Sequence, residues 1–177
     1  FMVEDDASRE DGRIASLLRR APCELIRFPG GEMADNYHWR TQTLDNPKKW
    51  PFRDGPETMD TDEFMAWCRS IAAEPIFVAN LESSVKAGDV TAGAREAADW
   101  VRYCNREHEY GVTYWEIGNE TYLKGTYHPM TAREYGQAFA VFAKAMKAVD
   151  PSIRIGAVGP HRVKGRAGIE ADDANAP

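Results

Sequence analysis

The chain has 177 residues, 43% of them hydrophobic and 28% charged, which is ordinary for a globular protein with one core. Its formal net charge of −6 argues against nucleic acid or an anionic membrane as a partner, because such partners need a basic face. No apolar run approaches the roughly 20 residues that span a bilayer.

The cysteines and histidines predict neither a disulfide framework nor a metal site. Cys23, Cys68 and Cys104 are far apart and form no Cys-x-x-Cys motif, so we expect buried free thiols. The four histidines lack the spacing of metal ligands, and the sequence predicts no cofactor. We recognise no signal peptide, which leaves the compartment open.

The first predicted elements are the end of a strand at 1–3, an amphipathic helix over about 9–21 and a strand over 24–28. Arg27 interrupts the second, otherwise apolar strand. A buried guanidinium needs a counter-charge, so we expect a carboxylate beside Arg27, either as part of the architecture or to tune an active site. The following Pro-Gly-Gly could cradle a phosphate, but no Gly-x-Gly-x-x-Gly accompanies it.

A long connection over 35–60 follows, rich in proline, glycine and aromatic residues. It has too many aromatic side chains for disorder, and long loops inside compact domains are usually functional. The rings of Trp39 and Trp50 either stack on the apolar face of a sugar or pin the loop to the domain. For Tyr37 and His38 we favour pinning.

The remaining chain alternates between helical and strand patterns. Helices are predicted over 60–73, 94–105 and from the capping box at Thr131 to 149, and strands over 76–79, 112–117 and 153–158. This alternation predicts parallel β/α units in an α/β fold. We expect one incomplete domain over 1–158 and an irregular tail over 159–177.

The stretch 112–120, Val-Thr-Tyr-Trp-Glu-Ile-Gly-Asn-Glu, changes from a buried strand to polar residues. Ligands of parallel α/β folds lie at the carboxyl ends of the strands. Glu120 is therefore a candidate general acid/base, and Asn119 a candidate hydrogen-bond donor to a substrate hydroxyl. The alternative for Glu120 is a solvated loop carboxylate.

Several segments resemble the α-L-arabinofuranosidases of glycoside hydrolase family 51 and their relatives. They include Leu-Ile-Arg-Phe-Pro-Gly-Gly, Trp-Glu-Ile-Gly-Asn-Glu and the segments 37–39, 62–68, 73–75, 96–105 and 145–151. The resemblance implies a partial (β/α)8 TIM barrel of about strands 1 to 5. It also implies a retaining mechanism, with Glu120 as general acid/base and a second glutamate as nucleophile about 5–5.5 Å away.

The same resemblance implies a carbohydrate substrate, from arabinose-containing hemicellulose, and no cofactor. Asn80, Asn119 and Trp50 would line the sugar site, with Arg27 supporting it. Trp39 is a further substrate-binding candidate, through its aromatic ring alone. Glu32 stands where the family has an asparagine that touches the sugar, so a relative specific for another sugar remains an alternative. An oligomer is possible in the full-length enzyme.

No residue matches the nucleophile, which belongs at the end of the seventh barrel strand. Glu32, Asp35 and Glu82 also follow strands, but nothing in the sequence promotes one of them to that role. We therefore expect the chain to be part of a larger enzyme, lacking the C-terminal half of the barrel and inactive alone. The other hypotheses are a non-catalytic carbohydrate-binding half barrel and an unrelated doubly wound nucleotide-binding domain.

Overall fold

The computed structural model describes residues 13–21, 23–49 and 59–159. Their centre is a parallel sheet of four strands in the order β1-β4-β5-β6. The strands are β1 (Leu25–Phe28), β4 (Glu74–Ala79), β5 (Tyr114–Ile117) and β6 (Arg154–Ala157). The predicted parallel β/α repeat is confirmed. The strand end predicted at 1–3 and the tail from 160 lie outside the described residues.

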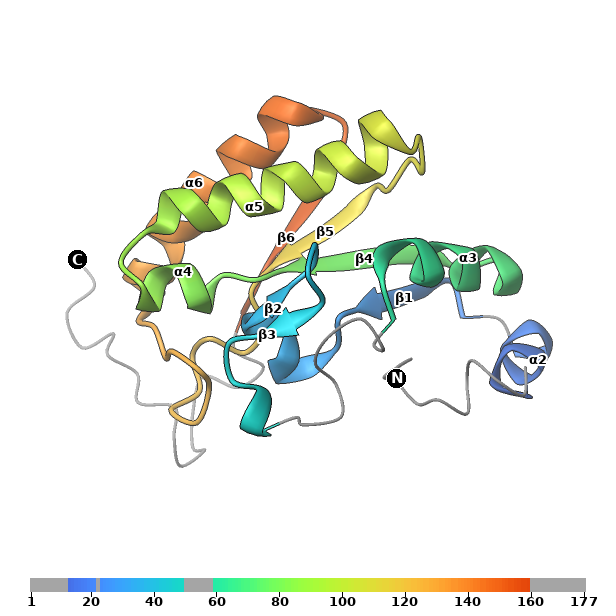
Figure 1. Ribbon diagram of the computed structural model, residues 1–177, viewed down its shortest axis with the longest axis horizontal. Coiled ribbons are helices and arrows are strands. Elements are labelled where there is room, and N and C mark those ends of the chain that lie inside the picture. Colours follow the sequence, from blue (N-terminus) through green and yellow to red (C-terminus); the bar gives the residue numbers. More distant parts are fainter. Residues whose placement is uncertain (1–12, 22, 50–58, 160–177) are drawn as a thin grey trace.

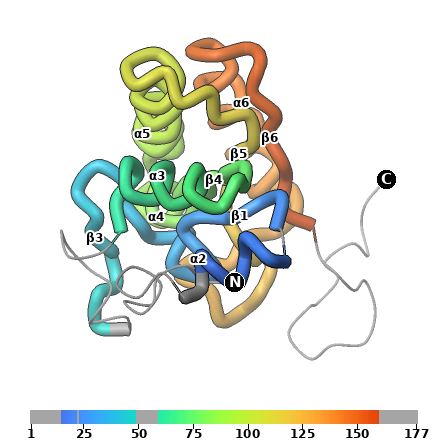
Figure 2. The backbone as a smooth tube through the Cα atoms, turned by 90° about the vertical axis from the view of Figure 1, so that its right-hand side faces the viewer, coloured from blue at the N-terminus to red at the C-terminus, as the bar shows by residue number. Residues whose placement is uncertain are grey.

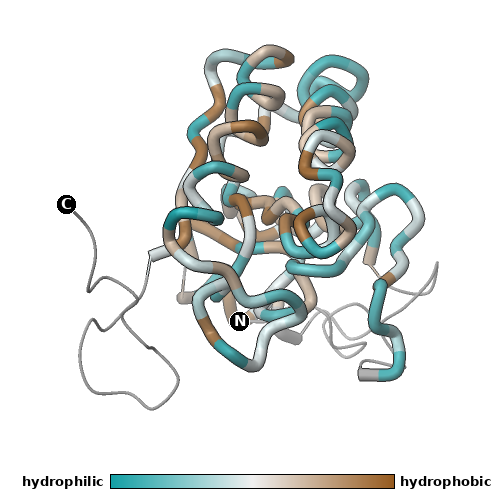
Figure 3. Tube along the Cα trace, turned by 90° about the vertical axis from the view of Figure 1, so that its left-hand side faces the viewer, coloured by the Kyte–Doolittle hydropathy of each residue, from teal (hydrophilic) through white to brown (hydrophobic). Residues whose placement is uncertain are grey.

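Helices follow the strands and cover one face of the sheet. They are α3 (Thr61–Ile71), α5 (Val90–Arg102) and α6 (Ala132–Val149), with α5 and α6 side by side in both views (Figures 1 and 2). A further helix, α2 (Arg13–Arg20), precedes β1 and contacts α3. Hydrophobic residues gather where the helices face the sheet (Figure 3).

The helix starts follow from local sequence. Asp60 accepts a hydrogen bond from the backbone of Glu63, whose side chain accepts one from the Asp60 backbone, which completes a capping box before α3. Thr131 and Glu134 form the same reciprocal pair before α6, as predicted. Asp89 caps α5 by accepting from the amide of Ala92.

Aromatic residues fill the core between the sheet and the helices. Phe77 on β4 lies against Phe64, Trp100 and Trp115, with ring centroids 4.7 to 5.3 Å apart. The buried indole N–H of Trp100 donates to the Thr61 hydroxyl at 3.0 Å, so the polar atom of this large ring has a partner. Cys68 and Cys104 are buried free thiols as expected, whereas Cys23 is only half-buried.

The structure places three pieces of regular structure where the sequence predicted a loop or a helix end. The connection after β1 contains a short hairpin of β2 (Tyr37–His38) and β3 (Thr43–Leu44) between two 3-10 helices, Gly31–Asp35 and Pro47–Lys49. The short helix α4 (Glu82–Lys86) follows β4, and a π-helix, Tyr103–Glu107, extends α5. Elements this short carry no hydrophobic period long enough to recognise in sequence. None of the described helices has the length and apolar character needed to cross a membrane.

Candidate active site

The pairing of the adjacent strands β4 and β5 continues for one residue after β5 ends. The amide of Gly118 donates to the Ala79 carbonyl at 2.9 Å. Asn80 and Asn119 then follow at the same edge of the sheet. Gly118 has φ of +76°, and a Cβ there would lie 3.0 Å from the Thr121 methyl group. The glycine is therefore required by the sharp turn that presents Asn119 and Glu120.

Asn119 is held by both its backbone and its side chain. Its amide N–H donates to Asp35 Oδ1 at 2.7 Å, and its side-chain oxygen accepts from Arg27 Nη2 at 3.1 Å. The Arg27 Nε donates to Glu116 Oε2 at 2.6 Å. The predicted carboxylate beside Arg27 is thus Glu116, and the guanidinium reaches from β1 past β4 to β5.

Glu120, in contrast, is exposed at the end of this turn. Its carboxylate accepts a hydrogen bond from the Tyr122 hydroxyl at 3.4 Å, and its carbonyl accepts one from the Leu123 amide at 2.9 Å. A fixed backbone with a solvent-accessible carboxyl group is the arrangement that a general acid/base needs to reach a bound substrate.

Asn80 lies at the same edge but is engaged locally. Its side-chain oxygen accepts from the Ser83 amide at 3.2 Å, and its amide group donates to the Ser83 hydroxyl at 2.8 Å. These bonds tie Asn80 to the first turn of α4. A sugar hydroxyl would therefore have to share or replace the contact with Ser83.

Glu32 lies on the wall of a polar hollow of about 410 Å³. The hollow lies where the segments after β1, β3, β4 and β5 meet. Its other lining residues are Asp45, Asn46, Lys86, Gly125, Thr126 and Tyr127. The Lys86 ammonium group lies 3.6 Å from the centroid of the Tyr127 ring, an attractive cation–π contact. Glu32 thus shares a polar hollow with hydroxyl, amide and ammonium groups that are compatible with a carbohydrate.

Trp39 corrects one expectation, because its ring is covered by protein. The side chain is 6% exposed, its ring is parallel to that of Trp100, and its N–H donates to the Glu96 carbonyl at 3.1 Å. The guanidinium of Arg40 lies 4.5 Å from the ring centroid. The structure favours the pinning role over stacking on a sugar. Trp50 lies outside the described residues.

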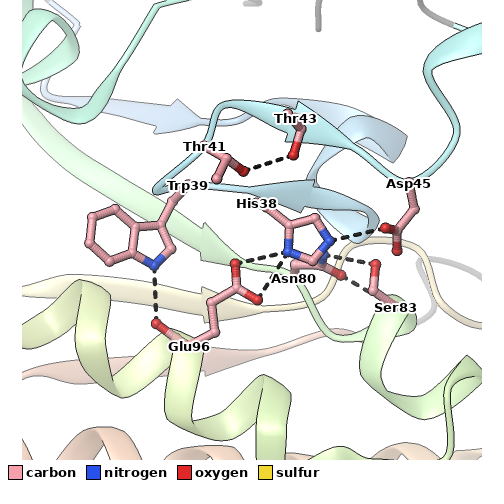
Figure 4. A network of polar contacts seen from close by, with 8 residues as sticks. All are labelled: His38, Trp39, Thr41, Thr43, Asp45, Asn80, Ser83 and Glu96. Atoms are coloured by element: carbon pink, nitrogen blue, oxygen red, sulfur yellow. Dashed lines mark hydrogen bonds and ion pairs between the residues drawn. The ribbon is translucent and has the colours of Figure 1, made fainter. Parts of the chain in front are cut away.

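His38 also pins the hairpin, as favoured from the sequence. Its Nδ1 lies 3.0 Å from Glu96 on α5 and its Nε2 lies 3.1 Å from Asp45 (Figure 4). The hydrogen bond to Glu96 is the main cause that raises the pKa of His38 to about 9. An imidazolium donates from both nitrogens, so the charged form satisfies both carboxylates at neutral pH.

The structure adds three carboxylates that the sequence left without a role. Glu116 pairs with Arg27, and the side chains of Asp35 and Glu82 are fully buried. Burial raises the pKa of Asp35 to about 8 and that of Glu82 to about 6. Glu116 is an acidic residue within the otherwise apolar strand Tyr-Trp-Glu-Ile. The reasoning applied to Arg27, that a charge in such a strand needs a partner, could therefore have identified Glu116 as well. The described residues contain no group of three potential metal ligands.

The four-stranded parallel β/α sheet, with an Asn-Glu pair at the carboxyl end of β5, matches part of the barrel of glycoside hydrolases. The comparisons agree, because the family model described as "Alpha-L-arabinofuranosidase 1 domain" matches residues 18–175. The chain therefore belongs to this family of α-L-arabinofuranosidases.

Among curated proteins, the chain is 31% identical to a probable α-L-arabinofuranosidase C of Aspergillus fumigatus, over 87% of this chain and 33% of the relative. It is 30% identical to the intracellular exo-α-(1→5)-L-arabinofuranosidase 1 of Bacillus subtilis, over 89% and 34%. The chain thus spans about a third of the length of the curated relatives that it matches.

Solved structures show the same relationship. An α-L-arabinofuranosidase from Thermotoga maritima, in complex with arabinose, matches with a TM-score of 0.66 and 29% identity, over 84% of this chain and 33% of that protein. The family 51 enzyme from Thermotoga petrophila matches with a TM-score of 0.64 and 31% identity, over 89% and 35%. The four-stranded sheet corresponds to part of the barrel of these enzymes.

Proposed function

We propose that this chain is the part of a retaining α-L-arabinofuranosidase that carries the general acid/base, Glu120. The observation that carries the proposal is the fixed Asn119–Glu120 turn at the end of β5. Asn119 is held from two sides by Asp35 and Arg27, while the neighbouring Glu120 carboxyl group is exposed. Membership of the arabinofuranosidase family supports the same assignment.

In the first step, Glu120 in its acid form donates a proton to the glycosidic oxygen as the bond from this oxygen to the anomeric carbon breaks. A glutamate nucleophile, which we place outside this chain, forms an ester with the anomeric carbon. In the second step, Glu120 as a carboxylate takes a proton from water while the water oxygen attacks the anomeric carbon and releases the sugar and the nucleophile.

The proposed substrate is an arabinose-containing hemicellulose oligosaccharide. Asn119 would contact a sugar hydroxyl near the reacting centre, and Arg27 would hold the Asn119 side chain in position. Asn80 would contribute if its bond to Ser83 is exchanged for one to the sugar. Glu32 supplies a carboxylate where the family resemblance implies an asparagine, so sugars other than arabinofuranose should be included among the substrates tested.

The test is Glu120→Gln in the full-length protein that contains this chain, assayed on aryl arabinofuranosides with good and poor leaving groups. Loss of a general acid should lower kcat/KM by about 10²- to 10⁴-fold for a poor leaving group. A good leaving group needs little protonation, so its bond cleavage should be much less affected. Added azide should restore turnover and yield a glycosyl azide, because azide needs no general base.

The matched control is Glu107→Gln, an exposed glutamate in the π-helix that precedes β5. It should leave both substrates unaffected. Equal losses for good and poor leaving groups in Glu120→Gln, without azide rescue, would contradict the acid/base role. Sugar binding without turnover, before and after the substitution, would instead support a carbohydrate-binding half barrel.

A further inference from the structure

Two fully buried carboxylates flank the segment that carries Glu120. Asp35 ends the 3-10 helix after β1, and Glu82 begins α4 after β4. Both side chains have no exposed surface. Acids are seldom buried without a partner, so their contacts indicate what they are buried for.

Each carboxylate accepts a backbone N–H from the same loop. Asp35 Oδ1 accepts from the Asn119 amide at 2.7 Å, one residue before Glu120. Glu82 Oε2 accepts from the His128 amide at 2.6 Å, near the far end of the loop. The contacts join segments 84 and 46 residues apart in the sequence. Each buried N–H that is paired in this way avoids the free-energy cost of losing its acceptor.

We propose that Asp35 and Glu82 are a pair of positioning residues that clamp residues 119–128 at both ends, and so fix where Glu120 stands. The inference rests on the proposed function of Glu120 and extends it to residues that do not touch the substrate. Asp35 sets the backbone at the start of the segment, and Glu82 holds its return toward α4.

The second oxygen of each carboxylate makes the clamp sensitive to protonation. Asp35 Oδ2 and Glu82 Oε1 are buried without a hydrogen-bond partner of ordinary geometry among the described residues. The Asn119 side chain also acts on the Asp35 carboxyl group, and the Thr126 side chain and Tyr127 backbone act on that of Glu82. The groups that act on Asp35 electrostatically are Glu82 and Arg27, and Glu32 acts on Glu82. Tyr135 on α6 also experiences the charge of Asp35. Ionisation of both acids therefore places two negative charges in one buried region.

The direction of the pH effect follows. The folded-state pKa values of Asp35 and Glu82, about 8 and about 6, lie above their ordinary values of 3.8 and 4.5. A raised carboxyl pKa means that the protonated form stabilises the fold, fully below the ordinary pKa. This stabilisation is lost as the pH rises through about 6 for Glu82 and about 8 for Asp35. We therefore expect Asp35 and Glu82 to hold residues 119–128 less firmly as the pH rises.

The test compares Asp35→Ala with Asp35→Asn, and Glu82→Ala with Glu82→Gln, in the full-length protein. Hydrogen exchange by mass spectrometry should show protection of residues 119–128 about tenfold lower in both alanine variants, because a buried N–H loses its acceptor. The amide variants keep an acceptor oxygen but cannot ionise. They should retain protection, after correction for the intrinsic exchange rate. Asp35→Asn should remove the pH dependence near 8 and Glu82→Gln that near 6.

Kinetics separate positioning from general stability. Asp35→Ala should lower kcat by about tenfold, since it displaces Glu120 from the reacting bond. The change in KM should be smaller, because Asn119 is the one proposed sugar contact that moves with it. At pH 6, the kcat of Asp35→Asn should equal that of the wild type. Toward pH 9, the activity of the wild type should fall and that of Asp35→Asn should not. Glu107→Gln again serves as the control, with unchanged exchange and kinetics.

The outcomes distinguish this inference from the proposed function. Unchanged exchange of residues 119–128 in both alanine variants would overturn the clamp, even if Glu120→Gln behaves as a lost general acid. If the alanine variants lose protection, the amide variants keep it and Glu120→Gln has no effect, then the clamp is supported. The acid/base role of Glu120 is rejected in that case. Loss of protection across the whole sheet would show a structural role only and would also overturn the inference.

Discussion

Arg27 shows how a single side chain connects two strands that are not neighbours in the sheet. Its guanidinium on β1 contacts Glu116 on β5 and the Asn119 side chain just after β5, although β4 lies between the two strands. The planar donor fork of arginine makes both contacts possible at once, which a lysine ammonium at this position could not reproduce in the same geometry. Arg27 therefore sets the rotamer of Asn119 while Asp35 sets its backbone.

His38 allows a prediction at the same scale. Its contact with Glu96 raises its pKa to about 9 from 6.5, so the charged form stabilises the fold fully below pH 6.5. This stabilisation is lost as the pH rises through about 9. The difference in unfolding free energy between the wild type and His38→Gln should therefore fall by about 1–2 kcal/mol as the pH rises from 6.5 to 9. The change is no larger because the site is partly solvated.

Chemical denaturation at a series of pH values measures this difference. His108→Gln is the matched control, since His108 is an exposed histidine just after the π-helix that extends α5. It should leave the pH dependence of the wild type in place. A constant difference between the wild type and His38→Gln from pH 6 to 10 would contradict the assignment of a charged His38.

The helices α4, α5 and α6 meet around one glycine. A Cβ at Gly93 would lie 2.4 Å from the Ser84 Cβ and 2.7 Å from a ring carbon of Phe142. α5 can therefore approach its two neighbours closely only because residue 93 has no side chain. This contact sets the position of α4, whose first residue, Glu82, reaches the loop after β5.

Two helical glycines provide a matched pair. Gly93→Ala should lower the unfolding free energy by about 1–3 kcal/mol, because the new methyl group overlaps buried neighbours. Gly136→Ala, on α6 with nothing within 4 Å of its Cβ position, should raise it by about 0.5–1 kcal/mol through helix propensity. Denaturant unfolding of both variants measures the two changes. Equal effects of the same sign would contradict the close approach of the three helices.

At the scale of the whole molecule, the sheet is open on both sides among the described residues. β1 and β6 are its outer strands. Three of the four residues of β6 are exposed and the fourth is half-buried, whereas the last three residues of β4 are buried. Unpaired strand edges invite further pairing. In the longer relatives, this part corresponds to about a third of the protein.

Residues 1–177 expressed alone should not hydrolyse an aryl arabinofuranoside. The retaining mechanism needs a second carboxylate about 5–5.5 Å from the first, and no residue of this sequence matches the nucleophile of the family. The assay is release of the aryl alcohol by the purified chain. Turnover that disappears in Glu120→Gln would show that a nucleophile is present after all, and would overturn this expectation.

The β/α alternation, the capping box at Thr131 and the loop that carries Asn119 and Glu120 could be predicted from the sequence because each rests on local signals. Hydrophobic periods identify strands and helices, Thr131 and Glu134 are only three residues apart, and Gly118 permits the turn directly. The need of Arg27 for a carboxylate could also be predicted, since burial of a guanidinium requires it.

Only the tertiary structure decided which partners meet. Glu116 lies 89 residues from Arg27, and Asp35 lies 84 residues from Asn119, so no local pattern relates them. Trp39 is covered by α5, a position that its neighbours in the sequence do not indicate. Burial and long-range pairing depend on how the strands and helices pack, and this packing gives Asp35 and Glu82 their raised pKa values and their place beside Glu120.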